Sequence, residues 1–521
     1  MKVVGLISGG KDSIFSLQKC VDFGHQIVAL ATLIPDSTEE ELNSHCFQTV
    51  ASKNVEYIAA SMQIPLIKHK FNAITKNTTQ YYQPTADDEV EELYALLAKV
   101  KQQHPSVNAV AAGAVLSNYQ RLRVENVCSR LQYVSLAYLW EYDQEQLLRD
   151  MFACHQRSIL VKVASWGLAP NMLGKSLLEL FPRLQKASRD CGMHISGEGG
   201  EYETTCVSSN LFSKSIEITK CSVDVVSDDE WAPVAHLLMN KAEFNLIPND
   251  FYSGAGEDTT QIKINFAYSG VGTNTERIPG PDMQFFHEET LIENSEIIEK
   301  LYTLRDRPKA GFDVPDEYGE LDGVRTTATL HDVGTDALTF LQCFDQFQHL
   351  IAYVEVELRD LSDFSVLNSA FSTVFSIPPP CRSCVQQSIS SVGEITLHFG
   401  YRQSTLHVQS VSSWAPACIG PYAQAVKTKN NVYISGQIGL CPETMKLVEP
   451  ENQYAQSLTN TESIMRTMGV CFSDAVEVRI FYVGHQPNVL LENVDASYIK
   501  CIPVPKLPAN AIVEIVTRFS V

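Results

Sequence analysis

The sequence has few basic residues for its length. Lys and Arg together number 40 against 61 Asp and Glu, so the formal net charge of the 521 residues is −21. Proteins bind nucleic acid without sequence preference through clustered Lys and Arg that contact phosphates, so this balance argues against stable nucleic-acid binding. Only a local basic groove remains compatible with it.

Long apolar runs are missing as well. No stretch reaches the length of roughly 20 apolar residues that crosses a bilayer, and the first residues lack the charged, apolar and small-residue regions of a signal peptide. We therefore expect a cytoplasmic protein without membrane contact. The 14 cysteines are scattered, and only Cys381 and Cys384 form a C-x-x-C pair. Without a second pair, reduced core thiols are expected rather than zinc ligands.

A Walker A phosphate loop is also absent. Gly174-Lys175-Ser176 has the end of that motif, but the required glycine five residues earlier is Ala169. Any nucleotide site must therefore be sought elsewhere.

A glycine-rich turn near the start of the chain is the strongest candidate. An apolar run typical of a buried strand, 3–7, precedes it, and a segment with helical spacing, 14–23, follows it. The turn, called the phosphate turn below, consists of Ser8, Gly9, Gly10, Lys11, Asp12 and Ser13. A strand-to-helix turn gathers backbone N–H groups at the positive end of a helix dipole, which favours phosphate binding.

Each side chain of this turn has a plausible role with phosphate. Glycines let the backbone approach closely, Lys11 adds a full charge, and Ser8 and Ser13 add hydroxyls. A carboxylate beside phosphate, here Asp12, is suited to Mg²⁺. An ordinary glycine-rich turn capped by Asp12 or Ser13 is the alternative that the residues leave open.

Strands and helices alternate through the first 200 residues. This order predicts a parallel sheet with helices on both faces, and ligands at the carboxyl ends of the strands. The predicted strands cover 3–7, 26–34, 64–69 and 107–112, and the predicted helices cover 14–23, 46–62, 87–103 and 119–131.

Two further polar clusters are candidates for that same edge. One opens the helix after the strand at 107–112 and contains Ser117, Tyr119, Gln120, Arg123 and Glu125. The other, called the acidic loop below, covers 196–204 and contains Glu198, Gly199, Gly200, Glu201 and Glu203. Crowded carboxylates repel one another, so a Mg²⁺ or ammonium site explains them better than an exposed turn, although that turn stays open. A solvated helix face is the alternative for the first cluster.

The pattern changes after about residue 225. Segments rich in Asp, Gly, Thr and Pro, at 250–282 and 305–322, are predicted as linkers or long loops. The predicted helices beyond them cover 338–350, 363–371 and 453–468, and the predicted strands cover 351–358 and 474–482. Two copies of a small helix-and-strand module are therefore expected, with domains at 1–225, 226–400 and 401–521.

The phosphate turn resembles the signature of the PP-loop ATP pyrophosphatases, which cleave ATP between the α and β phosphates. Three more stretches resemble the diphthine–ammonia ligase branch of that family: DEVEELYALLAKVK (88–101), GAVLSNYQRLRVENVCSRL (113–131) and GEGGEYET (197–204). The resemblance spans roughly residues 1–220. It implies an adenine nucleotide alpha hydrolase-like fold and amidation of diphthine to diphthamide on translation elongation factor 2.

The resemblance also implies the reactants and the residue roles. ATP, Mg²⁺ and ammonium would be used, with an acyl-adenylate intermediate and release of AMP and pyrophosphate. The phosphate turn would bind ATP, Asp12 would also hold the metal, and the catalytic residues would be Lys11, Asp12, Glu198 and Glu201. Nucleotide or substrate would contact Ser117, Tyr119, Gln120, Arg123, Glu125, Gly199, Gly200 and Glu203.

The C-terminal half resembles the Rid (YjgF/UK114) family in two copies. GPYAQAV (420–426), SGQIGL (435–440) and KLPANAIVEI (506–515) match the second copy, and PPPCRS (378–383) matches the arginine-bearing motif in the first. This implies two α+β, chorismate mutase-like modules that serve as an assembly platform and support an oligomer. The second copy lacks the arginine, so the expected pocket is composite and pairs Arg382 with Tyr422 and Gln437.

The sequence is compatible with two other functions. A PP-loop enzyme that modifies tRNA predicts a basic surface and, for thiolation, paired cysteines near the nucleotide. A nucleotide-sensing scaffold with ligand-binding Rid modules predicts no turnover of ATP. Turnover that depends on Lys11 discriminates against the scaffold.

Overall fold

The computed structural model describes residues 1–35, 54–71, 75–227, 229, 232–239, 244–249, 310–313, 324–375, 378–489, 491 and 494–521. The chain forms two compact units. Unit 1 comprises 1–271 and 410–414, and unit 2 comprises 272–409 and 415–521. Among the described helices, none is both long and apolar enough to cross a bilayer.

Unit 1 opens with a five-stranded parallel sheet, as the sequence predicts. The strand order is β3-β2-β1-β4-β5, and every neighbouring pair is parallel. The strands are β1 (Lys2–Leu6), β2 (Gln26–Pro35), β3 (Leu66–Phe71), β4 (Ala109–Ala111) and β5 (Val134–Leu136). Central residues such as Val3 and Val4 are fully buried, as expected where helices cover both faces of a sheet.

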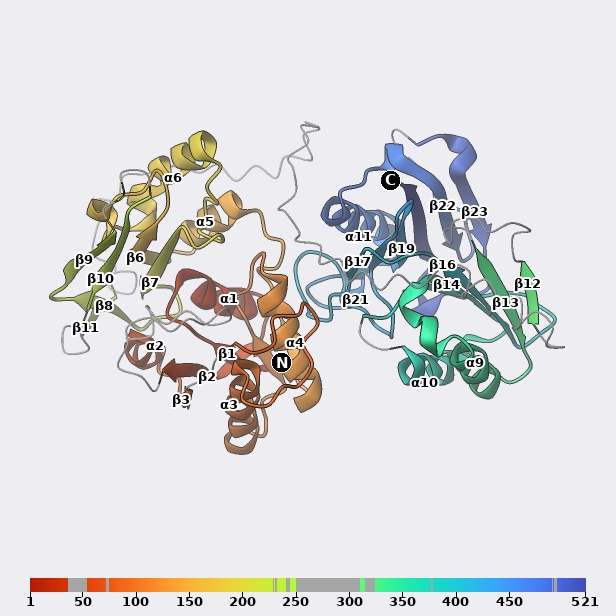
Figure 1. The fold of residues 1–521 in the computed structure, drawn as a ribbon, viewed down its shortest axis with the longest axis horizontal. Helices are drawn as coiled ribbons and strands as arrows, with labels where there is room; N and C mark the ends of the chain where they lie inside the picture. The colour runs from red at the N-terminus through yellow and green to blue at the C-terminus, as the bar shows by residue number, and fades with distance from the viewer. Residues whose placement is uncertain are drawn as a thin grey trace. The chain divides into compact units, whose positions relative to one another are not determined.

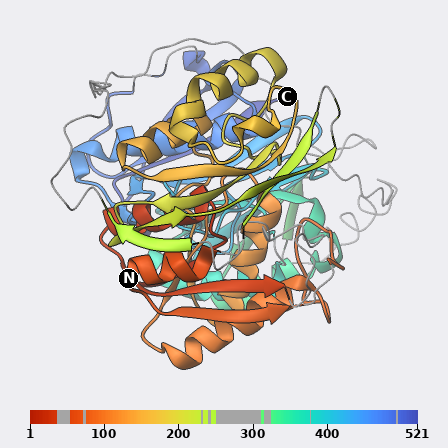
Figure 2. The same ribbon diagram turned by 90° about the vertical axis from the view of Figure 1, so that its left-hand side faces the viewer.

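Helices cover the two faces of this sheet. They are α1 (Lys11–Asp22), α2 (Val55–Met62), α3 (Glu89–Gln103) and α4 (Asn118–Leu131). Figure 2 shows α1 on one side of the red strands and α3 on the other. Side chains cap α3 and α4 at their starts: Asp88 accepts a hydrogen bond from the Val90 N–H, and Ser117 from the Gln120 N–H. Such caps satisfy N–H groups that have no partner inside the helix.

Unit 1 also contains a second, antiparallel sheet that the sequence does not predict. Its order is β7-β6-β10-β9, and a separate pair joins β8 and β11. The elements are α5 (Gln144–Ala153), β6 (Arg157–Ala164), α6 (Leu177–Cys191), β7 (Tyr202–Ser208), β8 (Lys214–Ile218), β9 (Ser222–Ser227), β10 (Val234–Leu238) and β11 (Phe244–Pro248). The acidic loop therefore precedes a strand, β7, instead of following the end of one.

Unit 2 contains two further sheets, which lie in the green and blue parts of Figure 1. The first has the order β12-β13-β16-β14-β15, and the second β17-β18-β19-β24-β22-β23. The first is built from β12 (Ala310–Asp313), β13 (Arg325–Leu330), α9 (Val333–Gln342), β14 (Ile351–Leu358), α10 (Phe364–Val374), β15 (Cys381–Gln386) and β16 (Gly393–Phe399). The second is built from β17 (Ser404–Leu406), β18 (Ala425–Lys427), β19 (Asn431–Ile438), α11 (Gln453–Met468), β22 (Ala475–Tyr482), β23 (Ile499–Pro503) and β24 (Val513–Ser520), and the small pair β20 (Leu440–Cys441) and β21 (Lys446–Leu447) lies outside it.

The two sheets of unit 2 share a four-stranded arrangement. In the first, β13 runs antiparallel to β16, β16 antiparallel to β14, and β14 parallel to β15. In the second, β19, β24, β22 and β23 repeat these directions in the same order. One helix follows the first strand in each case, α9 after β13 and α11 after β19. The chain order of these elements therefore repeats along with their arrangement in space.

The helix predicted at 338–350 is wrong in its bounds. The observed helix begins at Val333, where the Asp332 carboxylate accepts a hydrogen bond from the Thr335 N–H, and ends at Gln342. A 3₁₀ segment, Asp345–Leu350, follows it. Of the predicted helix at 46–62, residues 46–53 lie outside the described residues, as do both predicted linkers except for β12. The predicted domain boundaries at 225 and 400 remain predictions.

Candidate active site

The phosphate turn lies between β1 and α1, at the carboxyl end of a central strand. Gly9 has φ +93°, a backbone conformation that residues with a side chain rarely adopt. The Gly10 N–H donates to Ser8 Oγ at 3.3 Å, and Ser13 Oγ donates to the Gly10 carbonyl at 2.9 Å. The turn thus makes hydrogen bonds within itself as well as to its neighbours.

The antiparallel sheet holds the same turn from outside. The Cys206 N–H on β7 donates to the Gly9 carbonyl at 2.9 Å, and the Lys11 N–H donates to Thr204 Oγ1 at 3.1 Å. Gln156 Nε2 donates to the Lys11 carbonyl at 2.8 Å. Thr204 stands at the end of a quoted motif, whereas nothing in the sequence marks Gln156. Both are missing from the predicted site.

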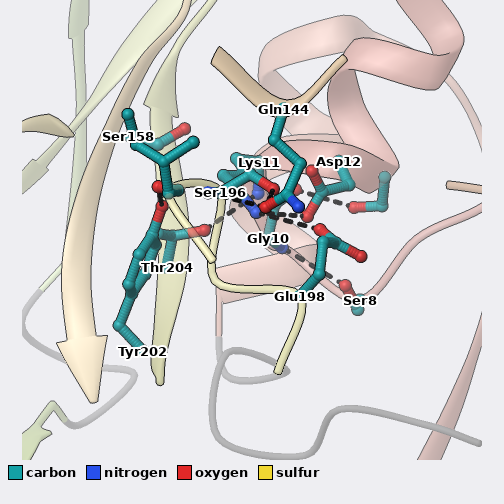
Figure 3. Close-up of polar contacts among 12 residues, drawn as sticks. Ser8, Gly10, Lys11, Asp12, Gln144, Ser158, Ser196, Glu198, Tyr202 and Thr204 are labelled. Carbon is teal, nitrogen blue, oxygen red and sulfur yellow. Dashed lines mark hydrogen bonds and ion pairs between the residues drawn. The ribbon is translucent and has the colours of Figure 1, made fainter. Parts of the chain in front are cut away.

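Lys11, Asp12 and Glu198 meet at the start of α1, as the sequence predicts for the turn and the acidic loop (Figure 3). Lys11 Nζ lies 2.7 Å from Asp12 Oδ2 and 3.8 Å from Glu198 Oε1. The Lys11 side chain is 5% exposed, which leaves its charge to be balanced by these two carboxylates. We call these three residues the charge cluster.

The charge cluster shifts the proton affinity of its members. Burial alone would lower the pKa of the Lys11 ammonium, but the Asp12 and Glu198 carboxylates outweigh this and raise it. Burial, followed by the negative charge of Asp12, raises the pKa of Glu198 to about 7. Lysine therefore stays charged near neutral pH, while Glu198 is poised to gain or lose a proton.

Asp12 offers a donor atom for a cation. Its Oδ1 is buried and has no hydrogen-bond partner among the described residues. Mg²⁺ in nucleotide sites takes one or two carboxylates and completes its shell with phosphate oxygens and water. The absence of any group of three metal-ligating side chains in the described ranges is therefore compatible with Mg²⁺. The residues present fit the ion, and Asp12 and Glu198 are the carboxylates that would hold it.

The other two carboxylates of the acidic loop point to different partners. Glu201 Oε1 accepts from the His194 N–H at 2.9 Å, and its Oε2 accepts from the Gly199 N–H at 2.8 Å. Glu203 lies 3.5 Å from Lys162 Nζ on β6. Gly200 is exposed and has φ +81°. Glu201 thus shapes the loop that carries Glu198. The catalytic role predicted for Glu201 and the ligand contacts predicted for Gly199, Gly200 and Glu203 remain predictions.

The predicted cluster on α4 is largely engaged in internal contacts. Arg123 is fully buried, and its Nη2 donates to the carbonyls of Asn77 at 2.7 Å and Thr79 at 3.1 Å. Its guanidinium carbon lies 3.1 Å from the Tyr119 ring centroid. Arg123 thus fastens the segment before α3, and half-buried Gln120 lies in the first turn of the same helix.

Glu125 lies deeper in the protein. It is 3% exposed, and its Oε1 is 2.7 Å from Arg121 Nη1. Ser117, predicted as a ligand contact, supplies the cap of α4. The predicted nucleotide or substrate contacts of these residues stay predictions.

Unit 2 contains a separate small cavity that is partly open to solvent. Arg382 and Tyr422 both line it, with the guanidinium carbon 5.4 Å from the ring centroid. Glu514 also lines it, and burial raises the pKa of this carboxyl to about 8. Gln437, the third predicted residue, is buried and donates its amide to the Ser435 carbonyl at 2.9 Å. Glu514 was missed, although it stands in the quoted stretch 506–515.

The fold and the charge cluster of unit 1 define an enzyme that handles nucleotide phosphates. Family models match three parts of the chain. They are the diphthamide synthase N-terminal domain at residues 1–134, the diphthamide synthase C-terminal domain at 143–240 and Endoribonuclease L-PSP at 412–518.

Curated relatives agree with these matches. A diphthine–ammonia ligase of Schizosaccharomyces pombe is 35% identical over 480 residues, which cover 86% of this chain and 74% of the relative. One of Danio rerio is 48% identical over 244 residues, 46% of this chain and 95% of the relative. Reactive Intermediate Deaminase A of Arabidopsis thaliana is 36% identical over 113 residues, 19% of this chain and 59% of the relative.

The chain belongs to the diphthine–ammonia ligase family, and it is an ATP-dependent ligase. The resemblance inferred from the phosphate turn and its companion motifs is confirmed. A Rid module is confirmed at 412–518, whereas a tandem of two such modules is not shown.

A methyl group at Gly113 should disturb the phosphate turn. A Cβ there would lie 2.8 Å from the Asp12 carbonyl carbon and 2.9 Å from Ser13 N, both backbone atoms. We expect Gly113→Ala to lower kcat/KM for ATP by on the order of 10²-fold, because the reacting groups are displaced. Gly334→Ala is the control, since its Cβ would meet a side-chain tip, Val366 Cγ1, also at 2.8 Å. Equal kinetics for the two variants would contradict the prediction.

Glu198 should make stability depend on pH. Its pKa rises from 4.5 to about 7 on folding, so the folded protein binds this proton more tightly than the unfolded chain. The resulting stabilisation is present below the unfolded pKa and is lost as the pH rises through about 7. The thermal midpoint of the wild type relative to Glu198→Gln should therefore fall as the pH rises from about 4.5 to about 7, and change little above that. A difference that stays constant would show that Glu198 has an ordinary pKa.

Proposed function

We propose that the charge cluster carries out the amidation of diphthine in two steps, with an acyl adenylate between them. ATP-dependent amidation of diphthine is the reaction of the family to which the chain belongs. A carboxylate does not react with ammonia at neutral pH, because its carbon is a poor electrophile and oxide is a poor leaving group. Transfer of AMP to the carboxylate supplies a good leaving group and releases pyrophosphate.

In the first step the phosphate turn binds the β and γ phosphates. Lys11 Nζ, fixed by Asp12 and Glu198, offsets the negative charge that develops on the departing pyrophosphate. Mg²⁺, with Asp12 as the proposed ligand, would supply further charge neutralisation. The orphan Oδ1 of Asp12 supports this assignment.

In the second step Glu198 acts as the general base. Its pKa of about 7 lets it take a proton from ammonium near neutral pH and release ammonia beside the acyl adenylate. Nitrogen then forms a bond to the carbonyl carbon, the bond to AMP breaks, and the second proton that nitrogen loses passes to the departing AMP phosphate or to solvent. The single observation that carries this role is the position of the largely buried Glu198 side chain, whose Oε1 lies 3.8 Å from Lys11 Nζ. Glu201 supports the step by fixing the loop.

The remaining predicted contacts belong to the same proposal. The loop from β4 to α4 lies against the phosphate turn at Gly113, which supports the proposal that Ser117, Tyr119 and Gln120, at the start of α4, contact nucleotide or substrate. Glu203, Gly199 and Gly200 lie in or next to the acidic loop. The pathway implies translation elongation factor 2 as the protein substrate, and we propose a cytoplasmic location on that ground.

We also propose that residues 324–399 form a diverged first Rid module. The support is the repeated strand order and the repeated directions of β13, β16, β14 and β15. The composite cavity then draws Arg382 from the first module and Tyr422 and Glu514 from the second. Oligomerisation through these modules remains part of the proposal.

The cavity is suited to a small carboxylate. Arg382 Nη1 and Glu514 Oε2 are buried and have no hydrogen-bond partner among the described residues. A guanidinium donates readily to carboxylate oxygens, and a protonated Glu514 adds another donor. We propose that these two groups, which both line the cavity, donate to the oxygens of one bound carboxylate.

The reaction itself tests the main proposal. Purified protein is incubated with ATP, ammonium and elongation factor 2 bearing diphthine, and both AMP release and the mass of the modified histidine are followed. Lys11→Ala should lower both by about 10²–10³-fold, because charge stabilisation at the phosphates is lost. Glu198→Gln should release AMP without a matching yield of amide. Lys19→Ala, on the same helix, should leave both unchanged.

Each contrary outcome is informative. AMP release without amide in the wild type would support cleavage of ATP to AMP but contradict diphthine as the acceptor, and would favour tRNA as the substrate. Binding of ATP without turnover would favour the scaffold function. Equal loss of AMP and amide in Glu198→Gln would contradict its role as the base.

Acetate and glycine serve as probes of the Arg382 cavity. Calorimetry should detect binding that Arg382→Met weakens at least about tenfold, as expected for a lost charge-assisted hydrogen bond. Affinity should fall as the pH rises through about 8, because Glu514 then ionises and repels the carboxylate. Arg359→Met, which removes an exposed arginine, is the control. Binding that is unaffected by Arg382→Met would exclude this site.

A further inference from the structure

The parallel sheet of unit 1 does not end at β5. Residues 410–414 belong to unit 1, although the residues on both sides of them in the chain belong to unit 2. Val411 pairs in parallel with Leu136. The Val411 N–H donates to the Ser135 carbonyl at 2.9 Å, and the Ala137 N–H donates to the Val411 carbonyl at 2.8 Å. These five residues, called the inserted strand below although Val411 alone forms the bridge, therefore cover two of the backbone groups that an edge strand leaves open, the Ser135 carbonyl and the Ala137 N–H.

Side chains attach the inserted strand to α4. Ser410 donates to Glu125 Oε1 twice, from its N–H at 2.8 Å and from its Oγ at 2.6 Å. The same oxygen accepts from Arg121 Nη1 at 2.7 Å, and the Arg121 and Glu125 side chains are each 2% exposed. A buried ion pair is stable only when further hydrogen bonds satisfy it, and Ser410 supplies two of them.

Arg121 also connects this ion pair to the start of α4. Arg121 Nη2 donates to Asn118 Oδ1 at 2.8 Å, in the first turn of the helix. The loop just before that turn approaches the phosphate turn so closely that Gly113 has room for no side chain. A shift of α4 along its axis would therefore change the position of the Asp12 backbone.

The ends of the inserted strand are fixed within unit 2. Gln424 Oε1 accepts from the Val408 N–H at 2.8 Å, and its Nε2 donates to the Val408 carbonyl at 2.8 Å and to the Pro416 carbonyl at 3.1 Å. This one buried side chain joins the two ends of the loop that presents the strand. A loop closed in this way loses less conformational entropy when its tip pairs with β5.

We propose that the inserted strand is a working part of the ligase domain, in which it docks on β5 and Glu125 and positions α4 against the phosphate turn. The partner for which this sheet edge is built is thus a Ser-Val segment of the same chain. Ser410 and Val411 are positioning residues, because they act on the reacting groups only through Glu125, Arg121 and α4.

Val411→Pro in the full chain tests this role. Proline removes the N–H that bonds to Ser135, so hydrogen exchange at 134–137 should accelerate. Amide formation per folded protein should fall about tenfold or more, with a rise in KM for ATP, because the phosphate turn is displaced. A peptide with the sequence of residues 409–414 should restore both exchange protection and activity, and the same peptide with proline in place of valine should not.

Ser410→Ala is a milder variant in case the proline variant fails to fold. It should show the same effects at smaller size, and Ser413→Ala, in the same segment, should show neither. Faster exchange at 134–137 with unchanged amidation would overturn the proposal, as would unchanged exchange in both variants. Because the proposal rests on the amidation activity, the wild type is assayed in parallel, and its failure would count against the proposed function instead.

Discussion

The ion pairing of the buried Lys11 ammonium is the interaction on which the candidate active site of unit 1 depends. Two carboxylates from distant parts of the chain balance this charge, one from the phosphate turn and one from the acidic loop. The backbone around Lys11 is held in turn by Thr204 on β7 and by Gln156, which stands directly before β6. The phosphate turn at the end of a parallel strand is thus held by a second, antiparallel sheet, because β7 carries Thr204 and the loop before β7 brings Glu198 to the turn.

The sequence predicts the part of this arrangement that is local. The strand, the turn and α1 follow from apolar patterning and glycine, and the acidic loop is visible as crowded carboxylates. The antiparallel sheet is not visible, since its strands pair across long separations and a single strand pattern does not reveal its partners. Gln156 was missed for the same reason, because an isolated amide gives no local signal.

Arg123 is a residue for which the sequence suggests a ligand contact and the structure shows internal hydrogen bonds. Its charge beside a strand end suggests a ligand, yet its guanidinium is occupied by the carbonyls of Asn77 and Thr79. Sequence alone does not distinguish an arginine that binds a ligand from one that fastens a loop, because both use the same donors. In unit 2, by contrast, Arg382 and Tyr422, which the motifs suggest for one pocket, line the same cavity together with Glu514, whereas Gln437 is not among its lining residues; their role in binding a ligand remains a prediction.

The position of residues 410–414 has a consequence for synthesis of the chain. The sheet edge at β5 emerges from the ribosome long before the segment that covers it. At about 5–20 residues per second, the roughly 270 intervening residues take on the order of 15–50 s. During that interval the ligase half presents an open strand edge, which is a target for chaperones and for mispairing. Unit 1 can therefore complete its fold only after residues 410–414 have been translated.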